Sequence, residues 1–370
     1  MVNYAETVLA PFSARPFCDV DSLILSWITY MHPPKEISDI RSGKGVEIRD
    51  LFRAEYFEEL FHGLWDPQNS RRLLTAMAAS PRFRHVRVKL FTEQFDPAAQ
   101  KQFSAMSFQL NDLCACVAFR GTDSTFVGWK EDFNMAFMDP VPSQLEACDY
   151  LNAAASSLSG ELFVSGHSKG GNLAVYAAVH ADPDVQKRIC AAFSHDGPGF
   201  LESVLRSETF VRMTPKIQKT LPQSSLVGML LQQQEKYRIV KSNRVSIWQH
   251  DPFSWEIRDG EFFYQDRLTA GARYLDSTLN HWIVSMTAEE RERLVDLLYR
   301  LVDTEQVMTV DQFKAGWQQN LPALLSTVSH MDEREKEFLV RTLKELGALG
   351  VKNFPALFSG IPKTSEIAQN

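Results

Sequence analysis

A serine set between glycines is the residue of this chain best suited to chemistry. It lies in the stretch VSGHSKGGN, residues 164–172, which contains the pattern Gly166-x-Ser168-x-Gly170. The apolar residues before it are typical of a short buried strand, and those after it are typical of a helix. A strand, a tight turn and a helix form a nucleophile elbow, in which the turn presents the serine hydroxyl to a substrate. We therefore predict that Ser168 is a nucleophile.

A serine hydroxyl needs a base that takes its proton and a carboxylate that orients the base. In enzymes with this elbow, the acid and then the base follow the serine along the chain. Among the nine histidines, this order and a position just before the C-terminal helices favour His281 as the base. His250 is the alternative. His167 lies inside the elbow, from which its side chain cannot readily reach the serine, so we expect it to line the pocket.

Two aspartates fit the role of the acid. Asp251, in the stretch WQHDPF, follows a strand by a short loop and precedes His281, and it is our first choice. Asp196, in the stretch SHDGPG, follows the strand next to the elbow helix and is the alternative acid. Its other interpretation is structural, because aspartate side chains stabilise tight turns of this composition.

Acyl transfer also requires donors for the negative charge that develops on the substrate oxygen. We expect one from the backbone N–H of Lys169, the residue after the serine. The second is expected at Thr122, in the stretch FRGTD at the end of an apolar strand, through its N–H and its hydroxyl. The cysteines and histidines show no spacing typical of a metal site, and we expect neither a metal nor an organic cofactor.

These residues need a scaffold, and the hydrophobic pattern indicates strands alternating with helices. Strands are predicted at 86–91, 103–110, 113–119, 161–164, 189–194 and 237–248, and helices at 21–31, 48–64, 70–79 and 144–158. The nearly continuous apolar run 113–119 is typical of a central strand covered on both faces. The pattern predicts an α/β fold with a mostly parallel central sheet and flanking helices.

Two further regions complete the chain. Residues 201–236 have an irregular helical pattern and are predicted to form a helical cap insertion. Beyond residue 285 the pattern is plainly helical, and Thr287 with Glu290 forms a capping box. We predict a catalytic domain over 1–285 and a helical subdomain over 286–370, which could serve as the contact of a homo-oligomer.

Composition and charge exclude several classes of protein. The chain has 370 residues, of which 44% are hydrophobic and 23% charged, as in ordinary globular proteins. A net charge of −7 without a basic tract argues against a nucleic-acid partner. No apolar run reaches the ~20 residues that cross a bilayer, and no signal peptide is visible. The five cysteines show no disulfide framework, so we expect a cytoplasmic protein.

Taken together, the motifs resemble the class 3 (fungal-type) lipase family of α/β-hydrolases. The resemblance rests on FRGT at 119–122, on Trp129 and Asp132 with two residues between them, and on GHSxGG at 166–171. The stretches DVDSLILS, HSKGGN and DGPGF are similar to a bacterial, lipase-like branch of largely unassigned function. The resemblance covers about residues 20–282.

The resemblance implies that Ser168 is the nucleophile, that Asp251 and His281 complete the triad, and that Thr122 and Lys169 supply the oxyanion donors. Position 169 is usually leucine in the lipases, so the lysine here places a cation beside the elbow.

The chemistry expected from these residues is hydrolysis of a carboxylic ester through an acyl-enzyme. An acyl lipid or a medium-length ester is the expected small-molecule substrate. A thioesterase or an acyltransferase would use the same residues. The alternative from another class is a catalytically silent scaffold that binds a partner. That alternative predicts that His281 or Asp251 lies far from Ser168, or that side chains fill the pocket.

Overall fold

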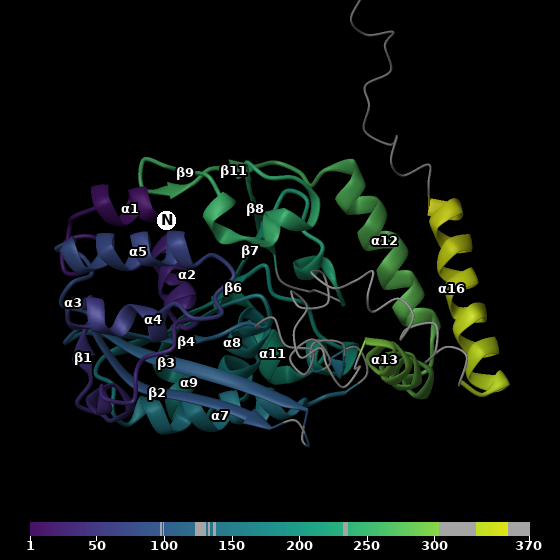
Figure 1. Cartoon of the computed structure of the whole chain (residues 1–370), viewed down its shortest axis with the longest axis horizontal. Coiled ribbons are helices and arrows are strands. Elements are labelled where there is room, and N and C mark those ends of the chain that lie inside the picture. Colours follow the sequence, from purple (N-terminus) through teal and green to yellow (C-terminus); the bar gives the residue numbers. More distant parts are fainter. Residues whose placement is uncertain are drawn as a thin grey trace, which may run out of the picture.

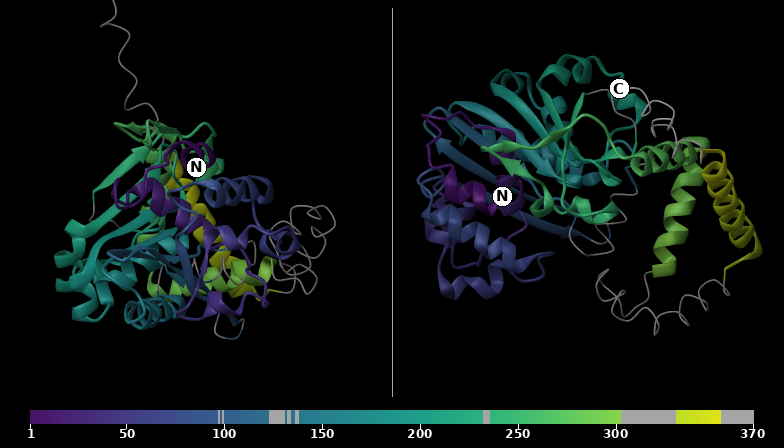
Figure 2. Two further views of the ribbon diagram at one scale, coloured as in Figure 1. Left: turned by 90° about the vertical axis from the view of Figure 1, so that its left-hand side faces the viewer. Right: turned by 90° about the horizontal axis from the view of Figure 1, so that it is seen from above.

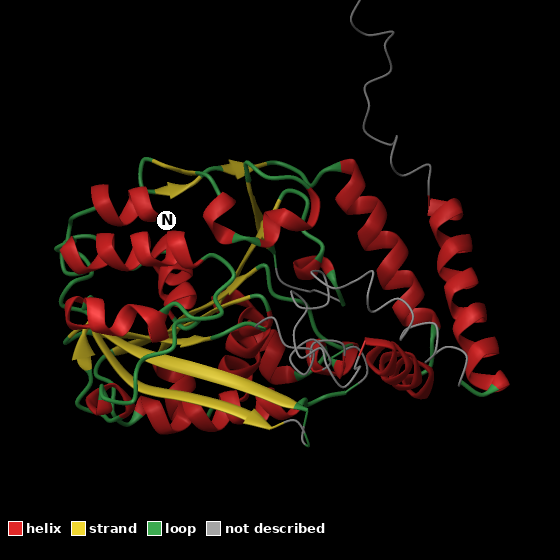
Figure 3. Cartoon of the chain, in the orientation of Figure 1, coloured by secondary structure: helices red, strands yellow, loops and turns green. Residues whose placement is uncertain are grey.

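The structure is a computed structural model that describes residues 1–96, 98, 100–122, 131, 134–135, 138–231, 236–302 and 331–353. In this part of the chain, a nine-stranded sheet has the order β1-β2-β3-β4-β5-β6-β7-β8-β11 (Figures 1 and 3). Its strands are β1 Val46–Glu47, β2 Arg87–Asp96, β3 Lys101–Asn111, β4 Cys114–Phe119, β5 Glu161–His167, β6 Ile189–His195, β7 Ile217–Pro222, β8 Tyr237–Val240 and β11 Tyr264–Gln265. Strands β9 Ile257–Arg258 and β10 Glu261–Phe262 form a separate hairpin.

The centre of the sheet is parallel. Each neighbouring pair from β4 to β8 is parallel, whereas β1 to β4 and the edge strand β11 pair in antiparallel fashion. The register aligns Phe119 of β4 with Gly166 of β5, and His167 of β5 with His195 of β6. The carboxyl ends of these three strands therefore meet at one edge, where open α/β sheets bind their ligands. The predicted mostly parallel, α/β-hydrolase-like sheet is confirmed.

Helices cover both faces of the sheet (Figure 1). One face packs against α1 Val2–Thr7, α2 Asp19–Ile28 and α5 Pro67–Ala79, and the other against α7 Pro142–Ala155 and α8 Lys169–His180. Alternation along β4 divides its side chains between the two cores, with Cys116 and Ala118 on the first face and Val117 and Phe119 on the second. The predicted central strand is thus covered on both sides.

The predicted helices at 70–79 and 144–158 correspond to α5 and α7. The long helix predicted over 48–64 is instead interrupted, as α3 Ile48–Leu51, a 3-10 turn at Ala54–Tyr56 and α4 Phe57–Leu60. A short helix, α9 Pro183–Arg188, links the elbow helix to β6.

The prediction of a helical cap over 201–236 is wrong in its second half. Helices α10 Glu202–Leu205 and α11 Glu208–Met213 are present, but β7 follows them and lies inside the sheet between β6 and β8. Strand β7 was not predicted because Lys219 and Thr220 are polar although buried, and they break the apolar pattern of a central strand. Strand β8 also ends early, and Ser246–His250 forms a 3-10 turn.

The C-terminal helices α12 Ala270–Ser285, α13 Ala288–Val302 and α16 Glu333–Asn353 lie together beside one end of the sheet (Figures 1 and 2). They share a small apolar core made of Met286, Leu294, Leu297, Met331 and Phe338. The predicted capping box of α13 is confirmed, with Thr287 N donating to Glu290 Oε2 at 3.1 Å and Glu290 N to Thr287 Oγ1 at 3.2 Å. Residues 303–330 and 354–370 of the predicted subdomain lie outside the described residues, and its boundary stays a prediction.

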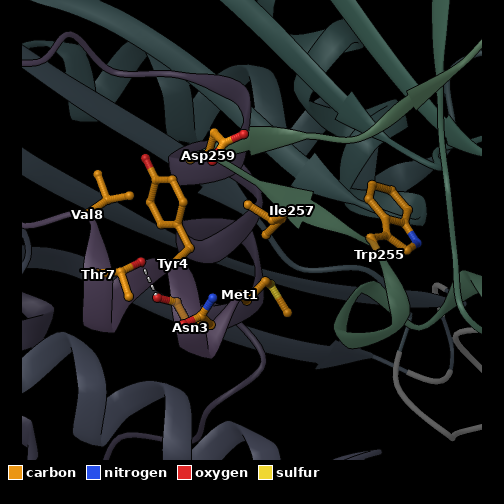
Figure 4. Close-up of a pocket in the computed structure, with 9 residues that line it drawn as sticks. Met1, Asn3, Tyr4, Thr7, Val8, Trp255, Ile257 and Asp259 are labelled. Atoms are coloured by element: carbon orange, nitrogen blue, oxygen red, sulfur yellow. Dashed lines mark hydrogen bonds between the residues drawn. The ribbon is translucent and has the colours of Figure 1, made fainter.

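A cavity of about 530 Å³ lies between α1 and the β9–β10 hairpin (Figure 4). Its lining includes Met1, Tyr4, Val8, Trp255, Ile257 and Asp259. The elbow serine does not line it, but Trp255 connects the two regions, because its ring centroid lies 6.4 Å from that of His167. None of the described helices is both long and apolar enough to span a bilayer.

Candidate active site

Ser168 stands on a strained turn between β5 and α8. Its backbone has φ 59° and ψ −134°, a conformation that a residue with a side chain adopts only at a cost. The flanking glycines are required by close backbone approach. A Cβ at Gly166 would lie 1.9 Å from the carbonyl oxygen of Gly170, and one at Gly170 would lie 2.2 Å from that of Phe119. This is the local geometry of the elbow that the sequence pattern predicts.

Asp196 and His250 are in direct contact. Asp196 directly follows β6, and its Oδ2 lies 2.6 Å from His250 Nδ1, so the imidazole N–H donates to the carboxylate. The other oxygen, Oδ1, accepts from Ser225 Oγ at 2.5 Å and from Gly228 N at 3.2 Å. The Asp196 side chain is fully buried. A buried carboxylate held by neutral donors and facing an imidazole has the arrangement of an acid that orients a base.

His250 is also attached to the elbow through His167. The His167 Nε2–H donates to the carbonyl oxygen of His250 at 2.9 Å, and the two rings lie in tilted contact, with centroids 4.7 Å apart and 33° between their planes. Burial, with a smaller effect of His250, lowers the pKa of His167 from 6.5 to about 3, so the ring is neutral. Its Nδ1 therefore accepts, and Tyr30 OH donates to it at 3.1 Å. The residue before Ser168 thus fixes the backbone of His250.

Asp251, the first choice for the acid, faces an arginine. Its Oδ2 lies 2.6 Å from Arg244 Nη1, and its Oδ1 accepts from Phe253 N at 2.9 Å, which caps a 3-10 turn at Pro252–Ser254. Burial raises the pKa of the Asp251 carboxyl. Both oxygens of the Asp251 carboxylate are therefore in contact with groups other than a histidine.

His281, the first choice for the base, lies on the outside of α12. Its side chain is exposed, and its Nδ1 lies 2.6 Å from the carbonyl oxygen of Ser277, one turn earlier in the same helix. The structure does not bring Asp251 and His281 together. It pairs Asp196 with His250, the two residues that the sequence left as alternatives.

The two expected oxyanion donors lie beside the serine. A Cβ at Gly121 would lie 2.9 Å from Ser168 Cβ and 2.6 Å from the carbonyl oxygen of His167, so the chain leaving β4 touches the elbow. Thr122 follows it and is partly buried. Lys169 is the first residue of α8, where backbone N–H groups have no partner within the helix.

The side chain of Lys169 is buried and paired. It is 1% exposed, and its Nζ donates to Glu131 Oε2 at 2.9 Å and to the carbonyl oxygen of Gln102 at 2.7 Å. The departure from leucine at this position therefore adds a buried ion pair instead of a free cation beside the elbow.

Tyr30 and Glu131 are residues of this region that sequence reasoning missed. Tyr30 follows the apolar helix α2, and no local pattern distinguishes Glu131 from a surface residue. Both reach the elbow from segments remote in sequence, so spacing carries no signal for them. Trp129 and Asp132, which contribute to the lipase resemblance, lie outside the described residues.

A strained serine elbow at the carboxyl edge of a mostly parallel sheet defines a lipase-like α/β protein. Comparison with known proteins agrees with this class. Residues 77–300, more than half of the chain, match the model of the Mbeg1-like family. The chain therefore belongs to this lipase-like family, and membership suggests a hydrolase.

Two other comparisons add little about function. No curated protein matches the chain. Among solved structures, the chain is similar to a fungal lipase in complex with an inhibitor, described as a model for interfacial activation in lipases. The two share 13% identity over 46% of this chain and 70% of the other, with a TM-score of 0.33.

Proposed function

We propose that the chain is a serine hydrolase that cleaves carboxylic esters through an acyl-enzyme intermediate. Ser168 is the nucleophile, His250 the general base and Asp196 the acid that orients it. The observation that carries the proposal is the 2.6 Å contact between Asp196 Oδ2 and His250 Nδ1, close to a serine held at positive φ. The contact that the proposal adds is a hydrogen bond from the Ser168 hydroxyl to His250 Nε2.

In the first half-reaction, Ser168 Oγ attacks the ester carbonyl carbon while its proton passes to His250 Nε2. Because Nδ1 donates to Asp196, Nε2 is the nitrogen that is free to accept this proton. The carbonyl oxygen becomes an oxyanion, and the backbone N–H groups of Lys169 and Thr122 donate to it. His250 then gives the proton to the leaving alcohol oxygen as the carbon–oxygen bond breaks, which leaves the acyl group on the serine.

In the second half-reaction, a water molecule replaces the alcohol. His250 takes a proton from the water, which attacks the acyl carbon, and returns that proton to Ser168 Oγ as the acid product leaves. A thioesterase differs only in the leaving group, and an acyltransferase only in the acceptor that replaces water.

Because the Lys169 ammonium forms an ion pair with Glu131, the site favours a neutral substrate. Paired in this way, the ammonium does not face an anionic leaving group. An acyl lipid or a medium-length ester is the substrate class that we propose, and the binding partner is then this small molecule.

The direct test is labelling with a fluorophosphonate probe, read by intact mass, on the full chain and on Ser168→Ala. We expect one adduct on the wild-type protein, mapped to Ser168 by peptide analysis, and none on the variant. Ester turnover should fall by several orders of magnitude in Ser168→Ala, with little loss of stability, because the hydroxyl serves reactivity and not packing. If a control hydrolase is labelled and this chain is neither labelled nor active on esters, the proposal is wrong and a silent scaffold is favoured.

A further inference from the structure

Two charged side chains next to the elbow have no part in the proposed chemistry. Lys169 and Glu131 are 1% and 0% exposed, and their charged atoms lie 2.9 Å apart. Burying an ion pair is expensive, and apolar residues of similar volume often stabilise a protein as well or better. Because Asp21 and Arg82 form another fully buried pair, burial by itself does not define a role, and the role follows from the groups that the Lys169–Glu131 pair joins.

Among the described residues, the hydrogen bonds of this pair link the elbow to two other elements. The Glu131 carboxylate accepts from Lys169 Nζ, from Gln102 N at 3.1 Å and from Ser143 N at 3.0 Å. The carbonyl oxygen of Gln102 accepts from Lys169 Nζ at 2.7 Å and from Ser143 Oγ at 3.0 Å. A buried polar network that is satisfied in this way is rigid, and it joins the elbow to β3 and to the start of α7.

The same end of β3 also holds the second proposed oxyanion donor. Gln102 and Ser104 both belong to β3, and the carbonyl oxygen of Ser104 accepts from Arg120 N at 2.9 Å. Arg120 leads through Gly121 into Thr122. The ammonium of Lys169 is therefore attached to Gln102, and the backbone of Arg120 to Ser104, two residues further along the same strand.

We infer that the Lys169–Glu131 ion pair is a positioning device that sets the distance between the two oxyanion donors. The inference rests on the proposed function. Donors stabilise a transition state only when they are held within a few tenths of an ångström of the developing charge. The elbow is strained at Ser168, so the first residue of α8 needs an anchor, and the ammonium fastens it to the strand that carries the other donor.

The test compares Glu131→Gln and Lys169→Met with a matched control, Asp21→Asn. Asp21, on α2, forms another buried ion pair, 2.6 Å from Arg82 with both side chains 0% exposed, and its hydrogen-bond partners are Tyr4, Cys18 and Arg82. The readouts are kcat and KM for a soluble short-chain ester, Tm, and the inhibition constant of a trifluoromethyl ketone. This inhibitor adds to an active serine and leaves an oxyanion in the site.

We expect kcat to fall about tenfold to a hundredfold in Glu131→Gln and Lys169→Met, with KM nearly unchanged. The inhibition constant of the ketone should rise by a similar factor, because the inhibitor needs the same donors. Asp21→Asn should lower Tm while leaving kcat and the inhibition constant at wild-type values.

A lower Tm with unchanged kcat and unchanged ketone affinity in both variants would show that the pair is merely structural, and would overturn the inference. Glu131→Gln preserves the shape of the side chain, so kcat and the inhibition constant can be measured on this variant if Lys169→Met fails to fold. A wild-type protein without turnover and without a fluorophosphonate adduct would instead overturn the proposed function, which distinguishes the two failures.

Discussion

Of the five histidines that follow Ser168, His250 and His281 are the two candidates for the base, and their surroundings differ. His250 lies at the carboxyl edge of the sheet, where its ring contacts Asp196 and His167. His281 lies on the exposed side of α12, where its ring bonds to its own helix. The difference teaches that chain order selects candidates for the base, whereas partners and burial distinguish between them.

The two candidate acids, Asp196 and Asp251, also differ in their partners. Asp196 is fully buried, is held by two neutral donors and offers its second oxygen to an imidazole. Asp251 is also buried, but its oxygens are committed to Arg244 and to Phe253 N. A carboxylate already neutralised by a guanidinium cannot stabilise an imidazolium as well as one that has neutral partners.

The largest expected effect separates the two histidines. His250→Ala should lower kcat by several orders of magnitude, because it removes the proposed base, and His281→Ala should leave kcat within about twofold. The measurement is steady-state ester hydrolysis together with the rate of fluorophosphonate labelling. Reversal of this order, with His281→Ala as the inactive variant, would return the assignment to the residue that the sequence favoured.

The next effect separates the two aspartates. Asp196→Asn keeps the size of the side chain but loses its charge, and kcat should fall by about 10³–10⁴. Asp251→Asn should lower Tm through the lost Arg244 contact and change kcat only severalfold. Parallel measurements of kcat and Tm on both variants test this, and equal kcat losses would contradict the distinction between them.

The smallest effect concerns pH and the buried histidines behind the site. Burial lowers the pKa of His167 from 6.5 to about 3 and that of His195 well below 6.5. At pH values below about 6.5, the unfolded chain therefore binds more protons than the folded chain. The contribution of these two histidines to the free energy of unfolding is fully present above that pH and is lost as the pH falls toward 3. Urea unfolding at about pH 6 and about pH 5 should show a loss of roughly 2 kcal/mol from these two residues.

Shifted pKa values of carboxyl groups, among them Glu93 and Asp251, also affect the measured free energy of unfolding. Against the effect of burial, His32 and Arg120 lower the pKa of Glu93 from 4.5 to about 2. The contribution of Glu93 to the free energy of unfolding is therefore lost only below about pH 4.5. The raised pKa of Asp251 acts with the opposite sign, and Asp251→Asn serves as the control that removes it. A free energy of unfolding that is equal at the two pH values in that variant would contradict neutral burial of the histidines.

Much of the fold was predictable because its signals are local. The apolar run of β4, the strand and helix around the elbow, and the capping box of Thr287 and Glu290 depend on neighbouring residues, and the structure contains them all. Strand β7 was missed for the converse reason. Its buried Lys219 and Thr220 are polar, so only their place in the sheet identifies them as part of a strand.

By itself, the sequence determined the serine and its turn, because close backbone approach requires glycines at fixed positions around Ser168. It also determined the class of fold, through the alternation of apolar strands and helices. The tertiary structure alone decided which carboxylate faces which imidazole and where the ammonium of Lys169 points. These contacts join segments that are distant along the chain, and they depend on where parallel strands end in space, which spacing in a sequence does not encode.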